Sequence, residues 1–510
     1  MTSNEIYWGA VSSFPLLGTM QLLPALGACF LWFLKRPLPA LLLALAVAGG
    51  EFYLATLLHN LLNTANPSLQ LAEKVVLLAP LVYHAGADGF TVLFILLTAF
   101  LTIMVMLYGW VRDLERMPQF LAMVLAMETV VISQVATVDL LWFSLMSLLQ
   151  IGLGGGLLHE WATSPEEGPA RTRYYQFLMV GWLLLIGATY LLGWEYADTT
   201  PDRRWSFDLV NLLDHSVPTG RQSVLFFLLF YGLAIRIPAF PLHGWLPGVA
   251  EHGTVAPALV FLIGVKTGVY GILRFLIPLF PDEVWQWHTF VVAFASAGTF
   301  HAALLALEQQ NMRRLLAYAV VSHTSVMLIG IFSLHASSFQ GGVLLAANFG
   351  LAVATLLFMA GLIFKHAHTL LLHKLGGLFD RQPLVGIGFL VASIAIVGMP
   401  GTPGFDAAHL VLEGAIDRFG ALVTIMAAVG NVAAAACLLW AFQRAFLASP
   451  GPQSVTGSLV RRIGVVEGTI AILMVAVQLY AGFFSDPWMR LVEAPSKALA
   501  HSFSRLEVLP

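Results

Sequence analysis

Residues 226–275 read FFLLFYGLAIRIPAFPLHGWLPGVAEHGTVAPALVFLIGVKTGVYGILRF, two apolar runs with one cation in the middle of each. The cations are Arg236 and Lys266, and a segment rich in proline, glycine and histidine separates the two runs. A charged side chain at bilayer depth costs at least about 2.5 kcal/mol, so both cations should face a protein interior or water. Pro238 and Pro241 remove backbone donors near Arg236, which membrane helices tolerate where the freed carbonyls border a polar cavity. This stretch therefore predicts a broken helix, a hydrated pocket and a second helix that carries a lysine.

The composition of the whole chain extends this prediction to a polytopic membrane protein. Of its 510 residues, 58% are hydrophobic and 10% are charged, whereas roughly a quarter are charged in a soluble domain. Apolar runs long enough to cross about 30 Å of hydrocarbon recur from one end to the other. We expect an all-α membrane protein with about fourteen transmembrane spans, near 10–34, 38–63, 87–108, 117–136, 138–159, 173–194, 221–240, 254–278, 287–306, 311–334, 341–365, 384–405, 419–446 and 466–485.

Charge and cysteine content exclude several classes of function. The formal net charge of −3 lacks the excess of cations that a nucleic-acid partner requires, so we expect no such partner. Cys29 and Cys437 both lie inside apolar spans, without metal-ligand spacing. We interpret them as small apolar side chains, and we expect no bound metal and no disulfide framework. The N-terminus lacks a basic region followed by a small-residue cleavage site, so the first span should remain in the mature protein.

The distribution of lysine and arginine predicts the orientation of the spans. Pairs such as Lys35 with Arg36, and Arg313 with Arg314, lie in odd-numbered loops, whereas the even-numbered loops carry few cations. The positive-inside rule therefore makes the odd-numbered loops cytoplasmic and places both termini on the outer side. An even number of spans also requires the termini to share a side. We expect a multi-pass protein of the cell inner (plasma) membrane, embedded in the lipid bilayer.

One acid lies deep inside an apolar span. Residues 126–143 read AMETVVISQVATVDLLWF and place Glu128 in span four. A carboxylate there must be paired or protonated, and Arg236 is the candidate partner, so we predict that the two approach within salt-bridge distance. A proton-carrying role and a static ion pair both remain open for Glu128. Asp88, just before span three, is interpreted as a helix cap, and the spans that precede it, including Glu51, as packing helices.

Two histidines and the lysine of span eight are further candidates for a proton pathway. Lys266 lies among apolar residues and glycines, and lysine exchanges a proton far more readily than arginine. His243, in the hinge, either relays protons or hydrogen-bonds the carbonyls that the break frees. His323 lies near the middle of span ten, which favours a relay role.

A second break interrupts span twelve. Residues 398–404 read GMPGTPG, and Asp406 and His409 follow them at helical spacing. These two side chains either line an exit to the outer face or lie at the interface beside a re-entrant turn.

The two breaks, five spans apart, predict internal symmetry. Paired discontinuous helices are typical of transporters built from inverted repeats, with the pathway at the interface between the repeats. We therefore expect a single membrane domain over 1–510, with a first repeat at 87–240 (spans three to seven). A second repeat would occupy 254–405 (spans eight to twelve), and C-terminal helices 419–510.

Four motifs carry a resemblance to a known family: FPLHGWLP at 240–247, GVKTGVYGILRF at 264–275, RRLLAYAVVSH at 313–323, and HKLGGLFDRQPL with GMPGTPGF within 373–405. In this order they resemble the antiporter-like proton-channel subunits of respiratory complex I, specifically the M-type subunit and its counterpart, the D-type subunit, in photosynthetic NDH complexes. The resemblance covers most of spans three to twelve. Related folds occur in Mrp antiporters, membrane-bound hydrogenases and two-subunit complexes that accumulate dissolved inorganic carbon.

The resemblance implies a pathway from which this sequence departs. In the family, a glutamate of span five pairs with a lysine of span seven, a lysine of span eight passes protons inward, and a lysine or glutamate of span twelve ends the path. Here Arg236 occupies the lysine position of span seven, and Leu148 falls about where the glutamate should be. Because arginine is a poor proton carrier, the switch is either rebuilt from Glu128 and Arg236 or absent. Further departures are Asn348 at a histidine position of span eleven and Ala408 near the acid of span twelve.

Two classes of function follow. The first is a proton-translocating, antiporter-like membrane subunit of a complex I-like energy-coupling complex, in which Glu128 and Arg236 set the charge state of Lys266. In that case His323 passes protons towards Asp406 and His409. The alternatives are a proton-coupled membrane subunit of a complex for uptake of carbon dioxide or bicarbonate, or a non-conducting scaffold for a catalytic partner.

The partners and cofactors follow from what the chain lacks. No motif for flavin, nucleotide, haem or an iron–sulfur cluster is recognisable, so we expect no cofactor and no catalytic chemistry of its own. Other membrane subunits, and as a further candidate a large soluble catalytic subunit, would supply the redox or hydration chemistry. In a complex I the chain would count as part of an NADH:quinone oxidoreductase.

Overall fold

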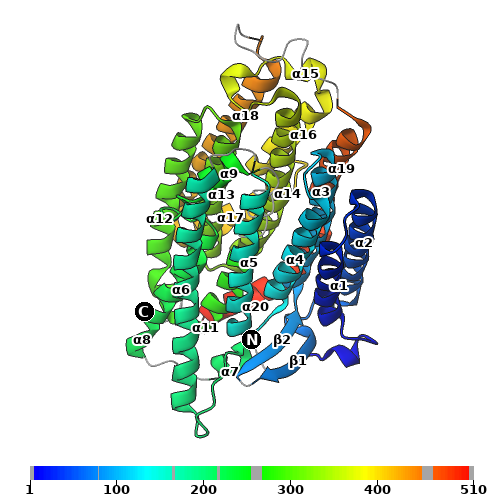
Figure 1. Cartoon of the computed structure of the whole chain (residues 1–510). Helices are drawn as coiled ribbons and strands as arrows, with labels where there is room; N and C mark the ends of the chain where they lie inside the picture. The colour runs from blue at the N-terminus through cyan, green and yellow to red at the C-terminus, as the bar shows by residue number, and fades with distance from the viewer. Residues whose placement is uncertain are drawn as a thin grey trace.

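The computed structural model describes residues 5–78, 80–162, 167–214, 219–253, 267–450 and 463–504, and shows a bundle of long helices (Figure 1). By length and composition, ten of the described helices can cross a membrane, and three shorter apolar helices accompany them. The chain is therefore a mostly helical, multi-pass membrane protein, as predicted, while the number of fourteen spans stays a prediction.

The helices of the first half are α1 (Leu16–Trp32), α2 (Pro37–Leu61), α3 (Gly89–Val111), α4 (Met117–Ala136), α5 (Leu140–Glu160), α6 (Glu167–Thr199), α7 (Leu209–Leu213), α8 (Thr219–Arg236) and α9 (Leu246–His252). Those of the second half are α11 (Ile277–Leu279), α12 (Pro281–Leu307), α13 (Met312–Ile331), α14 (Ala336–Ala367), α15 (Leu378–Arg381), α16 (Pro383–Val397), α17 (Gly404–Phe419), α18 (Ala421–Phe442), α19 (Val465–Phe483) and α20 (Asp486–Ser504). Short 3-10 turns, η1 (Trp8–Ala10) and η3 (Leu372–Lys374), and π-helical turns, η2 (Ile272–Leu276) and η4 (Gln443–Leu447), complete the described elements.

An antiparallel hairpin separates α2 from α3. Its strands are β1 (Gln70–Leu78) and β2 (Leu81–Ala87), with Lys74 opposite His84. The hairpin contains three valines and Tyr83, residue types that favour extended backbone. The prediction of an all-α fold is therefore wrong at the hairpin, because strand pairing depends on contacts that hydropathy along the sequence does not encode. In Figure 1 the hairpin lies at the lower end of the bundle, beneath α1 and α4.

The predicted break in span seven is present. α8 ends at Arg236, and the short α9 begins only at Leu246. Pro238 and Pro241 lie between the two helices, where a proline cannot donate a backbone hydrogen bond. The break therefore leaves Arg236 at a helix end inside the bundle.

The predicted break in span twelve is also present. α16 ends at Val397 and α17 begins at Gly404, so one apolar run becomes two helices. Gly398 has φ of +78°, a left-handed conformation that favours glycine. A Cβ at Gly398 would also lie 2.9 Å from the carbonyl oxygen of Gly404, so the turn requires glycine on two counts.

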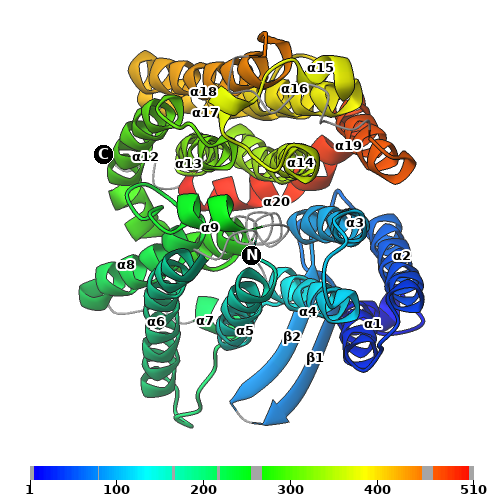
Figure 2. The ribbon, with the colours of Figure 1, turned by 45° about the horizontal axis from the view of Figure 1, so that its top comes forward.

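Two helices, α13 and α14, form the centre of the bundle, as Figure 2 shows. α14 is apolar and buried around nearly its whole circumference, which is typical of a helix surrounded by other helices. By contrast α1 and α18 expose large apolar side chains, such as Phe30 and Leu422, at 62% and 72%. Such outer faces suit contact with hydrocarbon.

α20 packs across the hairpin end of the bundle, between α14 and α3 (Figure 2). The side-chain amide of Gln340 on α14 donates a hydrogen bond to the carbonyl of Met489 at 2.9 Å. A Cβ at Gly89, the first residue of α3, would lie 1.7 Å from the carbonyl oxygen of Leu491, so only glycine permits this crossing. α20 therefore lies level with the start of α3.

Candidate functional site

Arg236 lies at the break of α8 among neutral hydrogen-bond acceptors. Its side chain is buried, and Nη2 donates to Oε1 of Gln150, to Oε1 of Gln134 at 3.4 Å and to Oγ1 of Thr267 at 3.1 Å. The guanidinium carbon also lies 5.9 Å from the centre of the Phe143 ring. Three amide or hydroxyl oxygens thus stabilise the cation, and none of them is an acid.

A small cavity adjoins this cation. Its volume is about 20 Å³, and Gln150, Tyr174, Arg236 and Trp245 are among its lining residues. A void of that size holds about one water molecule. Nε and Nη1 of Arg236 are buried and make no hydrogen bond to the described part of the chain. The pocket at the break therefore combines Arg236 and Gln150 with mostly apolar side chains, and it is small.

The predicted ion pair between Glu128 and Arg236 is not formed. Among the ion pairs of the described residues none joins them, and the buried carboxyl group of Glu128 has the hydroxyl of Thr102 on α3, not a cation, beside it. Arg236 instead meets α4 at Gln134, six residues after Glu128, which is about 9 Å along a helix axis. The sequence placed both charges at bilayer depth but did not determine their relative height.

Glu51 is a second buried acid that the sequence interpretation assigned to packing. It lies on α2, is 0% exposed, and neither of its carboxylate oxygens has a partner in the described residues. α2 packs against α4, and Glu51 is the acid that interacts electrostatically with Glu128. Among the described residues, these two carboxyl groups share the interior between α2 and α4 without forming an ion pair with a cation. Glu128 was identified in the sequence because it lies deep in an apolar span. The same signal applies to Glu51.

His243 lies beside two further groups that can exchange a proton. The centre of its ring is 6.0 Å from that of His301 on α12 and 6.2 Å from that of Tyr318 on α13. Nδ1 of His243 is buried without a hydrogen bond to the described residues, so the interpretation that freed carbonyls hold this atom gains no support. His301 was missed in the sequence because it belongs to no motif, and Tyr318 was missed although it lies within the motif RRLLAYAVVSH at 313–323.

His323 and the residues after the second break lie on different helices. His323 is 2% exposed on α13, and its ring centre is 5.8 Å from that of Phe349. Asp406 is half-buried on α17, and His409, one turn further on, is exposed. The amide of Asn348 on α14 donates to the carbonyl of Ala395 at 3.0 Å, beside the break.

Lys266 lies outside the described residues. Thr267, the next residue along the chain, is described and carries no charge, but its hydroxyl accepts a hydrogen bond from Arg236 at 3.1 Å. The segment after Lys266 therefore approaches the cation of span seven.

A buried ion pair closes the start of α3. Asp88 caps the helix by accepting a hydrogen bond from the backbone of Thr91 at 3.0 Å, as predicted. Its other oxygen lies 2.7 Å from Nη2 of Arg274, and the two side chains are 1% and 2% exposed. Tyr270 accepts a further hydrogen bond from Nε of Arg274 at 2.9 Å. The sequence identified the cap but not its distant partner.

A polar network joins the hairpin to neighbouring segments. Nδ1 of His84 lies 2.9 Å from Oδ2 of Asp208, and Nε2 lies 3.2 Å from Oε1 of Glu5. Lys74 also contacts Asp208, at 2.6 Å. Burial alone would lower the pKa of His84, but the hydrogen bonds and charges of Asp208 and Glu5 outweigh burial and raise the pKa to about 9.

The fold and these buried charges define a class of protein, the antiporter-like membrane subunits of ion-translocating complexes. The family model described as "NADH:quinone oxidoreductase/Mrp antiporter, TM" matches residues 156–435, more than half of the chain. The chain belongs to this family, which confirms the resemblance found in its motifs.

Known relatives and solved structures agree with this assignment. NADH-quinone oxidoreductase subunit M of Rhodobacter capsulatus is 28% identical over 422 residues, covering 79% of each chain. NADH-ubiquinone oxidoreductase chain 4 of Arabidopsis thaliana is 27% identical over 441 residues, covering 84% of this chain and 86% of the relative. A chain of respiratory complex I from Thermus thermophilus superposes with a TM-score of 0.82 at 27% identity, covering 95% of this chain and 99% of that chain. A chain of the Mrp complex from Dietzia sp. DQ12-45-1b shares the fold, with a TM-score of 0.84 at 19% identity over 96% of this chain and 99% of that chain.

Proposed function

We propose that this chain is a proton-translocating, antiporter-like membrane subunit of a complex I-like energy-coupling complex. The family match and the superposition on a complex I chain over 95% of this chain support the proposal. The observation that carries it is a set of three buried ionisable groups: Arg236 at a helix break, and Glu51 and Glu128 on the neighbouring helices α2 and α4. None of them is in an ion pair among the described residues. Such groups are costly in a membrane interior and are typical of a proton pathway.

The residues of the pathway take different roles in this proposal. Arg236 is a fixed positive charge, because arginine holds its proton and neutral groups hold its guanidinium. Glu128, with Glu51 beside it, stores a proton, since a buried carboxyl without a cation is favoured as the neutral acid. Lys266, in the segment that precedes Thr267, exchanges protons under the influence of the fixed cation.

The later part of the pathway runs through the second half of the chain. His243 receives protons at the first break, with His301 and Tyr318 as neighbours. His323 passes them across α13, and Asp406 and His409 release them. The half-buried position of Asp406 and the exposure of His409 support an exit at this end.

Repeats, orientation and location complete the proposal. Residues 87–240 and 254–405 are the two inverted repeats, each with one broken helix. Both chain ends lie on the outer side of the cell inner membrane: Glu5 contacts the hairpin through His84, and α20 crosses at the start of α3, which supports a shared side. The other membrane subunits of the complex are the partners. Exposed apolar residues on β1, Val76 and Leu78 at 66% and 76%, offer a surface for one of them.

A non-conducting scaffold is the second candidate function. The observation that favours it is Gln150, an amide, as the partner of Arg236, because an amide cannot take up the proton that a family glutamate would exchange. A scaffold would need the fold and the buried cation for assembly only. The two proposals differ in whether Lys266 must titrate.

The test is proton flux through the purified complex. The complex is reconstituted into liposomes with an internal pH dye, and a potassium diffusion potential drives proton uptake. We expect Lys266→Ala to abolish the potential-driven flux while the complex still assembles, and Lys35→Ala, a change in a loop residue, to leave it unchanged. Proton flux at the wild-type rate in Lys266→Ala would refute the pathway and favour the scaffold.

A further inference from the structure

Three polar side chains meet where the break after α8 packs against α12 and α13. The ring centre of His243, in the break, lies 6.0 Å from that of His301 and 6.2 Å from that of Tyr318. Nδ1 of His243 is buried, but its Nε2, the ring of His301 and the hydroxyl of Tyr318 are not enclosed. None of these three groups has a hydrogen bond to the described residues. Polar groups in proteins are normally satisfied by protein or by water, so water must solvate this cluster.

The cluster lies at the surface of the bundle, not at its centre. Figure 2 shows α12 on the outside, with α13 beside it. His301 is exposed, and so is Pro241 of the break. The ring centre of Phe240 is 5.1 Å from that of His301, and a Cβ at Gly298 would lie 2.5 Å from Cβ of Phe240, so glycine lets the break pack directly against α12. The break therefore reaches the outside of the bundle beside His301.

The cluster lies near one end of the helices that carry it. His301 is six residues before the end of α12 at Leu307, and Tyr318 is six residues after the start of α13 at Met312, so each is about 9 Å from a helix end. The interfacial layer on each side of a bilayer is roughly 5–8 Å thick, so water can reach this depth. Figure 1 places α11, which precedes α12, at the hairpin end. His301 is therefore near the opposite end, which is cytoplasmic in the proposed orientation.

His301 interrupts an otherwise apolar outer face of α12. Phe290, Phe294 and Leu304 lie on the same face and are 36%, 42% and 64% exposed. Such side chains suit hydrocarbon, whereas an imidazole in hydrocarbon would lose its hydrogen bonds to water. From His288 to the end of α12, His301 is the one ionisable side chain. An ionisable group at membrane depth points to a functional role.

No charged side chain of the described residues holds either histidine of the cluster in an ion pair. Against this part of α12, α13 contributes Tyr318, and α18 contributes the thiol of Cys437, which donates to the carbonyl of Ala303 at 3.4 Å. The contacts of α8, α11 and α20 with α12 lie nearer its other end. A static structural role would require a partner for the histidines, and these elements provide none.

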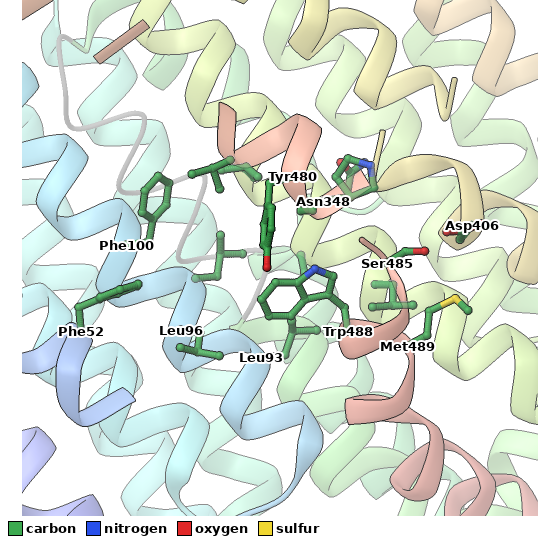
Figure 3. Close-up of a pocket in the computed structure, with 17 residues that line it drawn as sticks. Phe52, Leu93, Leu96, Phe100, Asn348, Asp406, Tyr480, Ser485, Trp488 and Met489 are labelled. Atoms are coloured by element: carbon green, nitrogen blue, oxygen red, sulfur yellow. The ribbon is translucent and has the colours of Figure 1, made fainter. Parts of the chain in front are cut away.

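A cavity between α2, α3, α14, α19 and α20 does not offer protons another entry. Its volume is about 290 Å³, and Figure 3 shows mostly apolar side chains around it, such as Phe52, Leu96 and Phe100. It presents almost no polar surface, and apolar cavities hold no ordered water. Asp406 is among its lining residues, but protons move along water and polar groups, which this cavity lacks.

We propose that His301 and Tyr318 form the entry through which protons from the cytoplasmic side reach His243. This inference rests on the proposed function of the chain as a proton-translocating subunit. Neutral His301 takes up a proton from water at one ring nitrogen and releases the proton of the other, so the ring returns to its neutral form as the other tautomer. Water held by the hydroxyl of Tyr318, which both donates and accepts hydrogen bonds, passes that proton to Nε2 of His243.

The first test is potential-driven proton flux into liposomes in which the cytoplasmic end of the complex faces the bath. His301→Ala should slow the flux at least about tenfold, as removal of a proton-transferring group does, and Tyr318→Phe should slow it less. His159→Ala, an exposed histidine on α5, should leave it unchanged. Imidazole added to the bath should restore most of the flux in His301→Ala, because a soluble base can replace a proton carrier but not a structural side chain. Lys266→Ala liposomes with imidazole give the background.

The outcomes separate this inference from the proposed function. Wild-type flux in His301→Ala, or a loss that imidazole does not restore, would overturn the entry while the flux still depends on Lys266. Flux that is independent of Lys266 would refute the proposed function itself, and the role of the entry with it. The thermal midpoint of each complex controls for misfolding.

A second test does not depend on proton flux. In a Cys29→Ala/Cys437→Ala background, His301→Cys should react with a charged, membrane-impermeant maleimide added on the cytoplasmic side, because a thiol reacts as the thiolate, which water stabilises. Ala297→Cys, about one turn deeper on the same exposed face, should react at least about tenfold more slowly. Equal rates for the two cysteines, or no labelling of His301→Cys, would overturn the hydrated entry.

Discussion

Breaking the buried pair of Asp88 and Arg274 should destabilise the protein strongly. At a separation of 2.7 Å, and with an effective dielectric constant of about 20, the attraction is about 6 kcal/mol. In Asp88→Asn the arginine would keep its hydrogen bond to Tyr270, and the asparagine would keep an acceptor for the backbone of Thr91. The loss should therefore be about 3 kcal/mol, the lower end of the range of about 3–5 kcal/mol for a stranded buried charge.

The assay is the free energy of unfolding of the complex in nanodiscs, measured for a double-mutant cycle. Asp88→Asn/Arg274→Gln leaves no unpaired charge, so it should recover at least half of the loss. Proton flux per folded complex should be unchanged in both variants, because the pair lies outside the proposed pathway. A loss below about 1 kcal/mol in Asp88→Asn would show that the pair is solvated or that another group compensates Arg274.

Three other predictions follow from the described contacts. Glu128→Gln should slow potential-driven proton flux at least about tenfold, as removal of a proton-transferring group does, while Glu160→Gln, at an exposed ion pair, should leave it within about twofold; equal rates would remove Glu128 from the pathway. The pKa of His84 is raised from 6.5 to about 9, so its stabilisation should be complete below pH 6.5 and disappear as the pH rises to about 9. A thermal-unfolding series should show a loss of about 3 kcal/mol over that range in wild type but not in His84→Ala. Arg236→Lys should retain the positive charge but titrate, so proton flux should become dependent on pH where the wild type is not; an unchanged pH profile would contradict the fixed-charge role.

The two helix breaks could be predicted because local chemistry determines them. Proline removes a backbone donor wherever it stands, and Gly398 permits a left-handed turn whatever surrounds it. The cap at Asp88 is local in the same sense, since its hydrogen bond reaches only to Thr91. The local sequence alone was therefore sufficient to predict the two helix breaks and the helix cap.

The partners of the buried charges could not be predicted, because they come from distant helices. Arg236 was assigned to Glu128 on charge alone, yet its contacts are Gln134 on α4 and Gln150 on α5. Glu128 and Gln134 are six residues apart on α4, which corresponds to about 9 Å along the helix axis. This distance is longer than an ion pair. Arg274 was overlooked for the same reason, because its acid lies at the start of α3.

Neutral partners change what Arg236 can do in a family built on exchange between an acid and a base. When an acid lies beside a lysine, both groups change charge as a proton moves between them. When a neutral amide lies beside an arginine, the arginine keeps its positive charge throughout proton transfer. The cation therefore acts at a distance: at about 10 Å, with an effective dielectric constant of about 20, it still contributes about 1.7 kcal/mol to the charge state of a neighbour. That is about one pKa unit, enough to change the protonation of a carboxyl or a lysine roughly tenfold. In the proposed pathway, proton movement near the first break is accordingly carried by Glu51, Glu128, Lys266 and His243, while Arg236 keeps a fixed charge.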